Sequence, residues 1–449
     1  MKIPNIIIIL CDDIGYGDIG CYGSRLNRTP SLDKMAYEGM LFKDFYVVSP
    51  VCSPSRAGLM TGCYPKRIGL DSGKDFCVLL PGDSIGLNPS EITIADILRK
   101  AGYATKIIGK WHLGDQIPFL PKNHGFDSYF GLPYSNDMCP HYPFNEKFHF
   151  PPLPLMREDK VIEIDPNQAS LTDRYLAEAV SFISDCVRNK NKFFLYFAHM
   201  YVHEPIYVPY KYLFNSLNGP YGAAVEHLDY TTGILLDTLT KLGIDQDTLV
   251  IFTSDNGSCC RGGGSNAPLK GEKGTTWEGG VREPCIMRWP GFIPQKTICS
   301  KIVTSMDFLP TLAYLAGTKP PEDRIIDGKD IRPLIFNETG AQSQYNAFFY
   351  YGSGDHSLHA VRSGEWKLHL IRKELYNLRS DICEEHNVYN KHPNVVKHLS
   401  KLADACRYDL GDNYTDTKGT NCRVVGQVEN PVTLTSEKEM DSFIKALYD

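Results

Sequence analysis

The chain has 449 residues, of which 47 are basic and 53 acidic, giving a formal net charge of −6; 42% are hydrophobic and 22% charged. These values are typical of a globular protein, and the length favours two or three domains. The mild negative charge argues against a nucleic acid or an anionic membrane surface as partner, because either would require a basic face. The apolar run at residues 6–11 is far shorter than the roughly 20 residues of a membrane span.

The N-terminus begins Met-Lys-Ile-Pro and enters this run directly, without the regions of a signal peptide. We therefore expect a cytoplasmic protein, or a secreted or periplasmic one if a leader has been removed. The 14 cysteines are too few for a disulfide scaffold at this length, and most are expected to be small buried thiols. Disulfide pairing of the adjacent Cys259 and Cys260 is left open.

Short apolar runs alternate with amphipathic stretches up to about residue 337, which is the pattern of an α/β fold. Four runs predict buried parallel strands, apolar on both faces: residues 6–10, 104–108, 193–198 and 249–253. Five amphipathic stretches predict helices: residues 31–39, 93–102, 171–187, 225–242 and 305–316. Ser31 and Thr93 are the predicted N-caps of the first two helices, which end at Gly39 and Gly102.

After about residue 337 the pattern changes to closely spaced strand-like pieces separated by turn residues. They lie at residues 348–351, 360–362, 366–371 and 374–377. Together with a predicted terminal helix near residues 441–447, they indicate a small antiparallel domain. We therefore predict two domains, residues 1–340 and 341–449.

Polar side chains follow each of the four predicted strands, at the edge where open α/β sheets place their ligand sites. In chain order they are Asp12, Asp13, Lys110, His112, His199, His203, Asp255 and Asn256. One pair alone is explained by turn chemistry or by a solvated acidic corner. Four pairs, combining oxygen ligands with cations, indicate one site assembled from separate loops. The carboxylate and amide oxygens suit Ca²⁺ or Mg²⁺ better than Zn²⁺.

Residues 15–20 read Gly-Tyr-Gly-Asp-Ile-Gly, a literal match to the dinucleotide-binding motif after a strand. The context argues against that function, because Asp12, Asp13 and Asp18 would repel a pyrophosphate and the next residues are a poor helix start. We interpret the glycines as allowing a sharp turn away from the acidic pair.

Residues 52–62 read C-S-P-S-R-A-G-L-M-T-G. Ser53 is the predicted N-cap and Pro54 the first helical residue, which leaves Cys52 at the positive end of a helix. Arg56 lies four positions after Cys52, on the same face, and a helix N-terminus with a guanidinium binds tetrahedral oxyanions. A thiolate phosphatase would have C-x₅-R, whereas the spacing here is C-x₃-R. A buried cysteine beside a structural arginine is the alternative.

This segment resembles the signature of the type I, formylglycine-dependent sulfatases, in which a dedicated enzyme oxidises the cysteine to Cα-formylglycine. Further blocks match the family in order over about residues 4–335: D-D-I-G-Y-G-D at 12–18, G-K-W-H-L-G at 109–114, S-D-N-G at 254–257 and G-E-K-G-T-T-W-E-G-G-V-R at 271–282. Among subfamilies the chain is most similar to arylsulfatase A and the N-acetylgalactosamine sulfatases. The resemblance implies an alkaline-phosphatase-like α/β fold with a large mixed sheet flanked by helices, and a small C-terminal domain with an antiparallel sheet and a helix.

The resemblance also implies a role for each matching residue. Ca²⁺ would be bound by Asp12, Asp13, Asp255, Asn256 and the residue made from Cys52. The catalytic residues would be Cys52, Arg56, Lys110, His112, His203, Asp255 and Lys273.

Within that set, Arg56 would stabilise the aldehyde hydrate, while Lys110 and Lys273 would bind sulfate oxygens. Asp255 would be the base for attack on sulfur, Lys273 or His203 would protonate the leaving alcohol, and His112 would assist sulfate release. The family blocks favour His203 over His199 and Lys273 over Lys270.

The predicted function is hydrolysis of a small-molecule or glycan sulfate ester, such as galactose sulfate or N-acetylgalactosamine sulfate, with the formylglycine-generating enzyme as a transient partner. Two alternatives are a phosphoesterase of the same superfamily, with two transition metals and a Thr or Ser nucleophile, and a non-catalytic relative that binds sulfated glycans. Residues 131–155 are rich in proline and aromatic residues. They predict either a pocket rim that stacks on a sugar or aryl ring, or a surface crossover.

Overall fold

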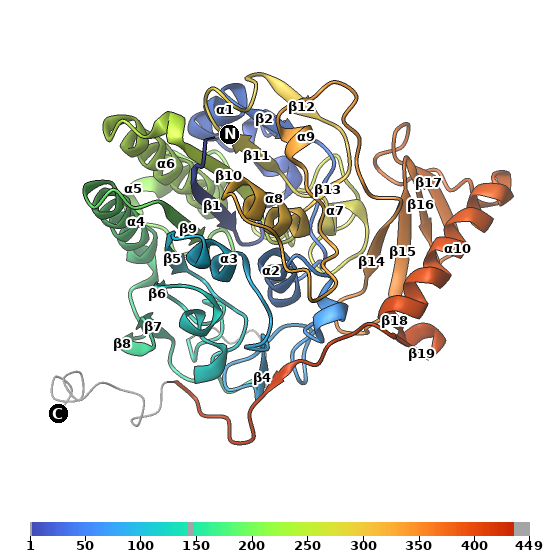
Figure 1. Cartoon of the computed structure of the whole chain (residues 1–449), viewed down its shortest axis with the longest axis horizontal. Helices are drawn as coiled ribbons and strands as arrows, with labels where there is room; N and C mark the ends of the chain where they lie inside the picture. The colour runs from blue at the N-terminus through green and yellow to red at the C-terminus, as the bar shows by residue number, and fades with distance from the viewer. Residues whose placement is uncertain (1, 142–147, 435–449) are drawn as a thin grey trace.

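The structure is a computed structural model that describes residues 2–141 and 148–434. A ten-stranded sheet of these residues crosses the larger part of the molecule (Figure 1). In spatial order its strands are β12 (Thr297–Cys299), β2 (Met40–Phe42), β11 (Cys285–Arg288), β10 (Thr248–Ser254), β1 (Asn5–Cys11), β9 (Phe193–Ala198), β5 (Ala104–Gly109), β6 (Ser128–Gly131), β7 (Pro154–Arg157) and β8 (Lys160–Ile164). Strands β10, β1, β9, β5 and β6 are parallel, and β11 and β7 join them antiparallel at either side. The predicted large mixed sheet and its four predicted strands are confirmed.

Helices cover both faces of this sheet (Figure 1). One face carries α1 (Pro30–Tyr37), α4 (Leu171–Arg188) and α6 (Gly219–Lys241), and the other carries α2 (Cys52–Thr61), α3 (Ile94–Lys100) and α8 (Phe308–Leu315). Side chains of β1 alternate between the two cores, as the pleat of a strand requires. Ile7 and Ile9 pack in the first core, whereas Ile6, Ile8 and Leu10 pack in the second. Both faces of β1 are therefore buried, as the sequence predicts.

The predicted antiparallel sheet near the C-terminus is also present (Figure 1). Its strands are β14 (Phe348–Tyr351), β15 (Leu358–Ser363), β16 (Trp366–His369) and β17 (Glu374–Asn377), with α10 (Pro393–Leu410) packed against them. Helix α10 was not predicted, although its buried residues Leu399, Ala403, Cys406 and Leu410 have helical spacing. The helix predicted near residues 441–447 lies outside the described residues, and the boundary near residue 340 stays a prediction.

Shorter elements complete the described chain. They are β3 (Phe45–Tyr46), β4 (Ile85–Gly86), α5 (Tyr210–Leu213), α7 (Glu278–Val281), β13 (Val303–Thr304), α9 (Arg332–Ile335), β18 (Gly411–Asp412), β19 (Thr417–Lys418) and β20 (Gly426–Gln427). After α10 the chain returns to the larger part of the molecule, where β20 pairs with β4.

Two predicted N-caps are wrong. Ser31 lies inside α1, whose N-cap is Thr29, and Ser53 lies inside α2, whose first residue is Cys52. Val51 is still extended, and the Ser53 hydroxyl accepts a hydrogen bond from the backbone of Leu79 instead of capping its own helix. The Ser53 hydroxyl, which the local pattern predicts as a helix cap, is thus used in a tertiary hydrogen bond instead.

Thr93 caps α3 as predicted and forms a capping box with Asp96. Two helix boundaries differ from the predictions. Helix α6 begins already at Gly219, and a 3₁₀ turn at Ser305–Asp307 precedes α8.

The glycines of the rejected dinucleotide motif serve close packing rather than a sharp turn. Gly15 has a φ of −83°, which any residue adopts. A Cβ on Gly15 would lie 2.3 Å from the carbonyl oxygen of Ser265, and one on Gly17 would lie 2.7 Å from that of Ala267. Two 3₁₀ turns, Tyr16–Asp18 and Gly20–Tyr22, follow in place of the α-helix that a dinucleotide site needs.

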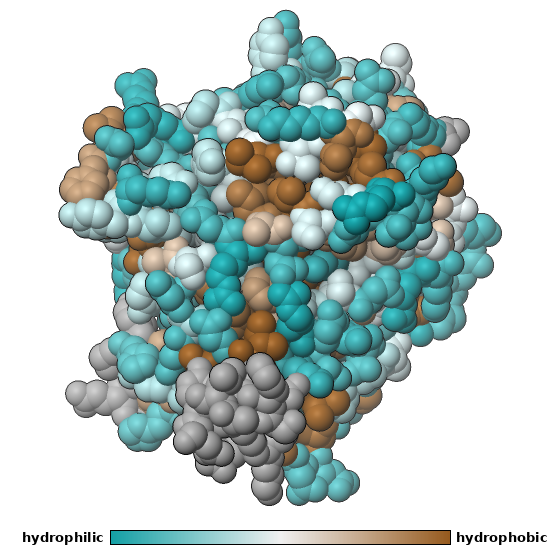
Figure 2. Space-filling view, turned by 90° about the vertical axis from the view of Figure 1, so that its left-hand side faces the viewer, coloured by the Kyte–Doolittle hydropathy of each residue, from teal (hydrophilic) through white to brown (hydrophobic). Residues whose placement is uncertain are grey.

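The face shown in Figure 2 is largely hydrophilic, with separate apolar patches. In the part of the chain that the structure describes, none of the helices has both the length and the apolar character to cross a bilayer.

Candidate functional site

Neighbouring parallel strands bring the predicted polar residues together at one edge of the sheet. Strands β1 and β10 pair in register, so that Asp12 and Asp255 are the first residues beyond two adjacent strands. On the other side of β1, strands β9 and β5 end at the same edge and are followed by His199 and Lys110. The predicted assembly of one site from separate loops follows from this register.

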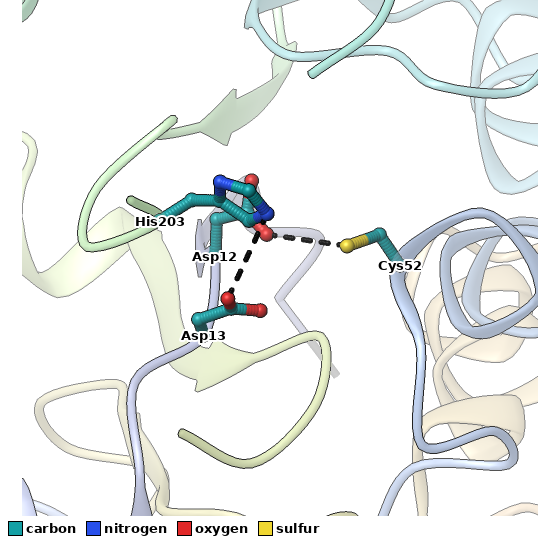
Figure 3. Close-up of side chains that lie close together, drawn as sticks. All are labelled: Asp12, Asp13, Cys52 and His203. Carbon is teal, nitrogen blue, oxygen red and sulfur yellow. Dashed lines mark hydrogen bonds and ion pairs between the residues drawn. The ribbon is translucent and has the colours of Figure 1, made fainter. Parts of the chain in front are cut away.

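Four side chains form a group that could hold a metal ion: Asp12, Asp13, Cys52 and His203 each place one ligand atom within 4.8 Å of the others (Figure 3). The aspartates follow β1, and Cys52 faces them from the first turn of α2. The Cys52 Sγ lies 3.5 Å from Asp12 Oδ1, and His203 Nε2 lies 3.8 Å from Asp13 Oδ2. Three predicted metal ligands are therefore adjacent, and His203, predicted for catalysis, lies beside them.

Asp255 and Asn256, the other two predicted ligands, lie against this group. Asp255 accepts a hydrogen bond from the Asp13 backbone N–H at 3.3 Å, and Asn256 Nδ2 donates to Asp13 Oδ1 at 2.6 Å. The Asn256 Oδ1 is buried and has no hydrogen-bond partner among the described residues. A buried acceptor without a donor, beside three carboxylates, fits a hard cation such as Ca²⁺.

Three predicted cations neutralise these carboxylates. Lys110 Nζ lies 2.6 Å from Asp12 Oδ2, and Lys273 Nζ lies 2.7 Å from Asp13 Oδ1. Arg56 is fully buried, with its Nη2 3.7 Å from Asp12 Oδ2. That Nη2 has no hydrogen-bond partner in the described part of the chain.

The electrostatic environment separates the titrating groups. Burial, reinforced by the charge of Asp12, raises the pKa of Asp255 to about 6. Burial also disfavours the charged form of Asp12, but the attraction of Lys110 outweighs it and holds the pKa of Asp12 well below its usual range. Burial raises the pKa of the Cys52 thiol well above its ordinary value, against the attraction of Lys110 and Lys273. Unmodified Cys52 is therefore a neutral thiol at pH 7, unlike the thiolate of a phosphatase.

The three histidines lie in different surroundings. His112 Nε2 donates to the Leu79 carbonyl at 2.9 Å, which leaves Nδ1 as the basic nitrogen, and burial lowers the pKa of the ring. His112 and His203 both line the cavity described below. His199 is fully buried with its ring against Phe197, and burial lowers its pKa to about 3. The structure thus places His199 in the core.

Lys270 and Lys273 lie on one loop but have different partners. The Lys273 ammonium contacts Asp13 and lines the cavity. The Lys270 ammonium donates to the Glu384 backbone carbonyl at 3.0 Å and lies 3.9 Å from the centre of the Trp277 ring. Lys270 therefore belongs to the contact with the C-terminal sheet rather than to the site.

A cavity of about 300 Å³ opens over the group of Figure 3. Beyond the predicted residues, its lining includes Phe76, Ser135, Asp137, Met138, Glu204, Arg261 and Glu272. The sequence analysis did not single out Ser135, whose hydroxyl accepts a hydrogen bond from Lys110 Nζ at 3.2 Å. Ser135 lies shortly after β6. The site residues at the sheet edge were predicted because they follow predicted strands, and β6 was not among those strands.

Comparisons with known proteins agree with this geometry. Residues 4–318 match the family model described as Sulfatase, and residues 272–408 match the one described as N-sulphoglucosamine sulphohydrolase, C-terminal. N-acetylgalactosamine-6-sulfatase of Rattus norvegicus is 42% identical over 380 residues, which cover 82% of this chain and 71% of that protein. Arylsulfatase A of Homo sapiens is 38% identical over 439 residues, which cover 92% of this chain and 83% of that protein. The solved structure of Ps i-CgsB in complex with k-i-k-neocarrahexaose has a TM-score of 0.82 and 30% identity, and covers 94% of this chain and 96% of that one.

Proposed function

Since the chain belongs to the sulfatase family and is a sulfuric ester hydrolase with an alkaline-phosphatase-like fold, we propose that it cleaves sulfate esters of sugars with a Cα-formylglycine made from Cys52 and with Ca²⁺. The position of Cys52 carries the proposal. It is the first residue of α2, lines the cavity and contacts Asp12, while its thiol is protonated and a poor nucleophile as it stands.

Asp12, Asp13, Asp255 and Asn256 would hold the Ca²⁺ together with the residue formed from Cys52. The ion would supply positive charge for the sulfate oxygens. The Asn256 Oδ1, without a hydrogen-bond partner among the described residues, and the oxygen-rich surroundings support this assignment.

A formylglycine hydrate at position 52 would supply a nucleophilic hydroxyl and a second hydroxyl for the later release of sulfate. Asp255 and Asp12 hold Arg56 and Lys110 in fixed positions. From there Arg56 would stabilise the hydrate and Lys110 would bind a sulfate oxygen without reorganising. Asp255, with a pKa of about 6, is mostly ionised at neutral pH and can accept a proton.

Three further residues, Lys273, His203 and His112, would act at the later stages. Lys273 faces the cavity from its own loop and would stabilise or protonate the leaving alcohol oxygen, with His203 beside it. His112 keeps a basic Nδ1 in the same cavity wall and would take the proton that accompanies sulfate release.

The names of the relatives support a sugar sulfate as substrate, because they denote an N-acetylgalactosamine-6-sulfatase and a protein in complex with neocarrahexaose. Residues 131–155 contribute Ser135 and Met138 to the cavity, and Phe148 packs on Phe76 of its rim. This supports the pocket rim over the surface crossover. The predicted rim residues Tyr142, Pro143 and Phe144 lie outside the described residues.

The two alternatives receive less support. A phosphoesterase of this superfamily would need two transition metals, whereas the described residues offer a single compact group of metal-ligand side chains, which includes a cysteine. A non-catalytic relative that binds sulfated glycans would not need a buried cysteine in contact with Asp12 at the start of α2. Identification of the bound metal in the purified protein separates the first alternative from a sulfatase.

The test is made on protein produced with and without a formylglycine-generating enzyme. Peptide mass spectrometry should show conversion of Cys52 to formylglycine in the first sample, and sulfate release from a panel of sulfated monosaccharides should follow the degree of conversion. Cys52→Ala should abolish turnover with an unchanged melting temperature, because the first turn of a helix accepts alanine with little loss. Full turnover by Cys52→Ala would contradict the proposal.

A further inference from the structure

The lining of the cavity carries charges of both signs. Lys273, one of the cations assigned to the sulfate, lines it together with Asp13 and Cys52. The described lining also includes three carboxylates outside the metal-binding group, Asp137, Glu204 and Glu272, and one further cation, Arg261. A sulfatase that recognises several anionic groups on its substrate would be expected to have more cations than carboxylates in this lining. Carboxylates in an enclosed site repel an anionic substrate group.

Asp137 has the most informative environment of the three. Its Oδ1 is buried and has no hydrogen-bond partner among the described residues. It lies two positions after Ser135, which accepts from Lys110, and both residues line the cavity. An unpartnered buried acceptor is costly, and a substrate hydroxyl or amide N–H would satisfy it if the side chain turned toward the cavity.

The other two carboxylates line the same cavity. In sequence, Glu204 follows His203 and Glu272 precedes Lys273. The Glu204 carboxylate is packed against the backbone of Gly262, where a Cβ would lie 2.5 Å from its Oε1. Three acceptors outside the metal-binding group therefore line the space that a substrate would enter.

We infer, on the basis of the proposed function, that the enzyme selects a neutral sugar ring with a single sulfate, whose hydroxyl or amide N–H groups donate to Asp137, Glu204 and Glu272. A second sulfate or a carboxylate on the same ring meets these carboxylates and is rejected. Phe76 and Met138 offer the apolar surface for the C–H face of the ring. The cavity, at about 300 Å³, lies at the small end of ligand pockets, which suits one ring.

The test compares kcat/KM for the 4-sulfate and the 6-sulfate of N-acetylgalactosamine with that for the 4,6-disulfate, with 4-nitrophenyl sulfate as the reference ester. The preferred monosulfate should exceed the disulfate at least about tenfold, because an added anion among three carboxylates is strongly disfavoured. Asp137→Asn and Glu204→Gln should each narrow this ratio about threefold or more, and high ionic strength should narrow it in the wild-type enzyme.

Asp185→Asn is the matched control, because Asp185 is an exposed carboxylate on α4 paired with Arg188. It removes the same charge far from the cavity and should leave the ratio unchanged. Equal or faster hydrolysis of the disulfate, or an unaltered ratio in both cavity variants with unchanged melting temperatures, would overturn the inference while leaving the sulfatase activity in place. Failure to hydrolyse any of the esters, 4-nitrophenyl sulfate included, would instead contradict the proposed function.

Discussion

Replacement of the two loop lysines is the most decisive comparison that the structure offers. Lys273→Ala removes an ammonium group that lines the cavity and lies 2.7 Å from Asp13. Loss of one fixed electrostatic contact of this kind costs about 10²- to 10³-fold in kcat. Asp13 keeps the hydrogen bond from Asn256 and the nearby ring of His203, so we expect the variant to fold.

Lys270→Ala is the matched change, three positions earlier on the same loop. Its ammonium lies over Trp277 and donates to Glu384, contacts that hold the loop against the C-terminal sheet. A cation–π contact contributes about 0.5–2 kcal/mol to stability. We therefore expect a small decrease in melting temperature. The loss in kcat should be less than about tenfold, much smaller than the loss caused by removing a fixed electrostatic contact in the site.

The assay compares kcat of both variants on 4-nitrophenyl sulfate and on a sugar sulfate. Nitrophenolate is a good leaving group that needs little help, so the loss in Lys273→Ala should be much smaller on the aryl ester than on the sugar ester. A larger loss in Lys270→Ala, or an equal loss on both esters in Lys273→Ala, would refute the role assigned to Lys273.

Three further predictions concern the metal, a buried ion pair and a buried histidine. Chelation should lower both turnover and the melting temperature, and Ca²⁺ should restore both, because an ion bound only to the folded state stabilises it by mass action; unchanged melting after thorough chelation would argue against the site. Lys367→Met should cost about 3–5 kcal/mol of unfolding free energy, since buried Lys367 lies 2.9 Å from Glu278 and 3.0 Å from Glu384, and chemical denaturation measures the loss. Burial lowers the pKa of His124 to about 4, below the value of about 6.5 in an unfolded chain, so the unfolded state takes up the proton first as the pH falls. The free energy of unfolding should therefore decrease below about pH 6.5. This residue should account for a decrease of about 2 kcal/mol between pH 7 and pH 5. Urea unfolding of His124→Phe at both pH values should lack this contribution.

Much of the site is encoded locally. Each buried strand is a short apolar run, and the polar residue that follows it is fixed by the chain itself, so the sequence alone assigns Asp12, Lys110 and Asp255 to one edge of the sheet. Parallel pairing then makes their proximity almost inevitable, because parallel strands end at a common edge. The choice of Lys273 over Lys270 came from the resemblance and stays a prediction. In the structure Lys273 contacts Asp13, whereas Lys270 donates to the Glu384 carbonyl.

Other features depend on contacts between segments far apart in sequence. Ser53 looks like an N-cap, but its hydroxyl binds Leu79 in the folded chain. Ser135 carries no motif, and only the approach of Lys110 marks it.

The amino-acid order specifies which residue types follow which strands, and their spacing identifies the family. Folding then settles which of those side chains are neutralised, which remain unpartnered and which line the cavity. The two kinds of information differ because a side chain's charge state and accessibility depend on burial and on partners from other segments. Asp12, held ionised by Lys110, and Asp137, with its Oδ1 unpartnered among the described residues, are both simple aspartates in the sequence.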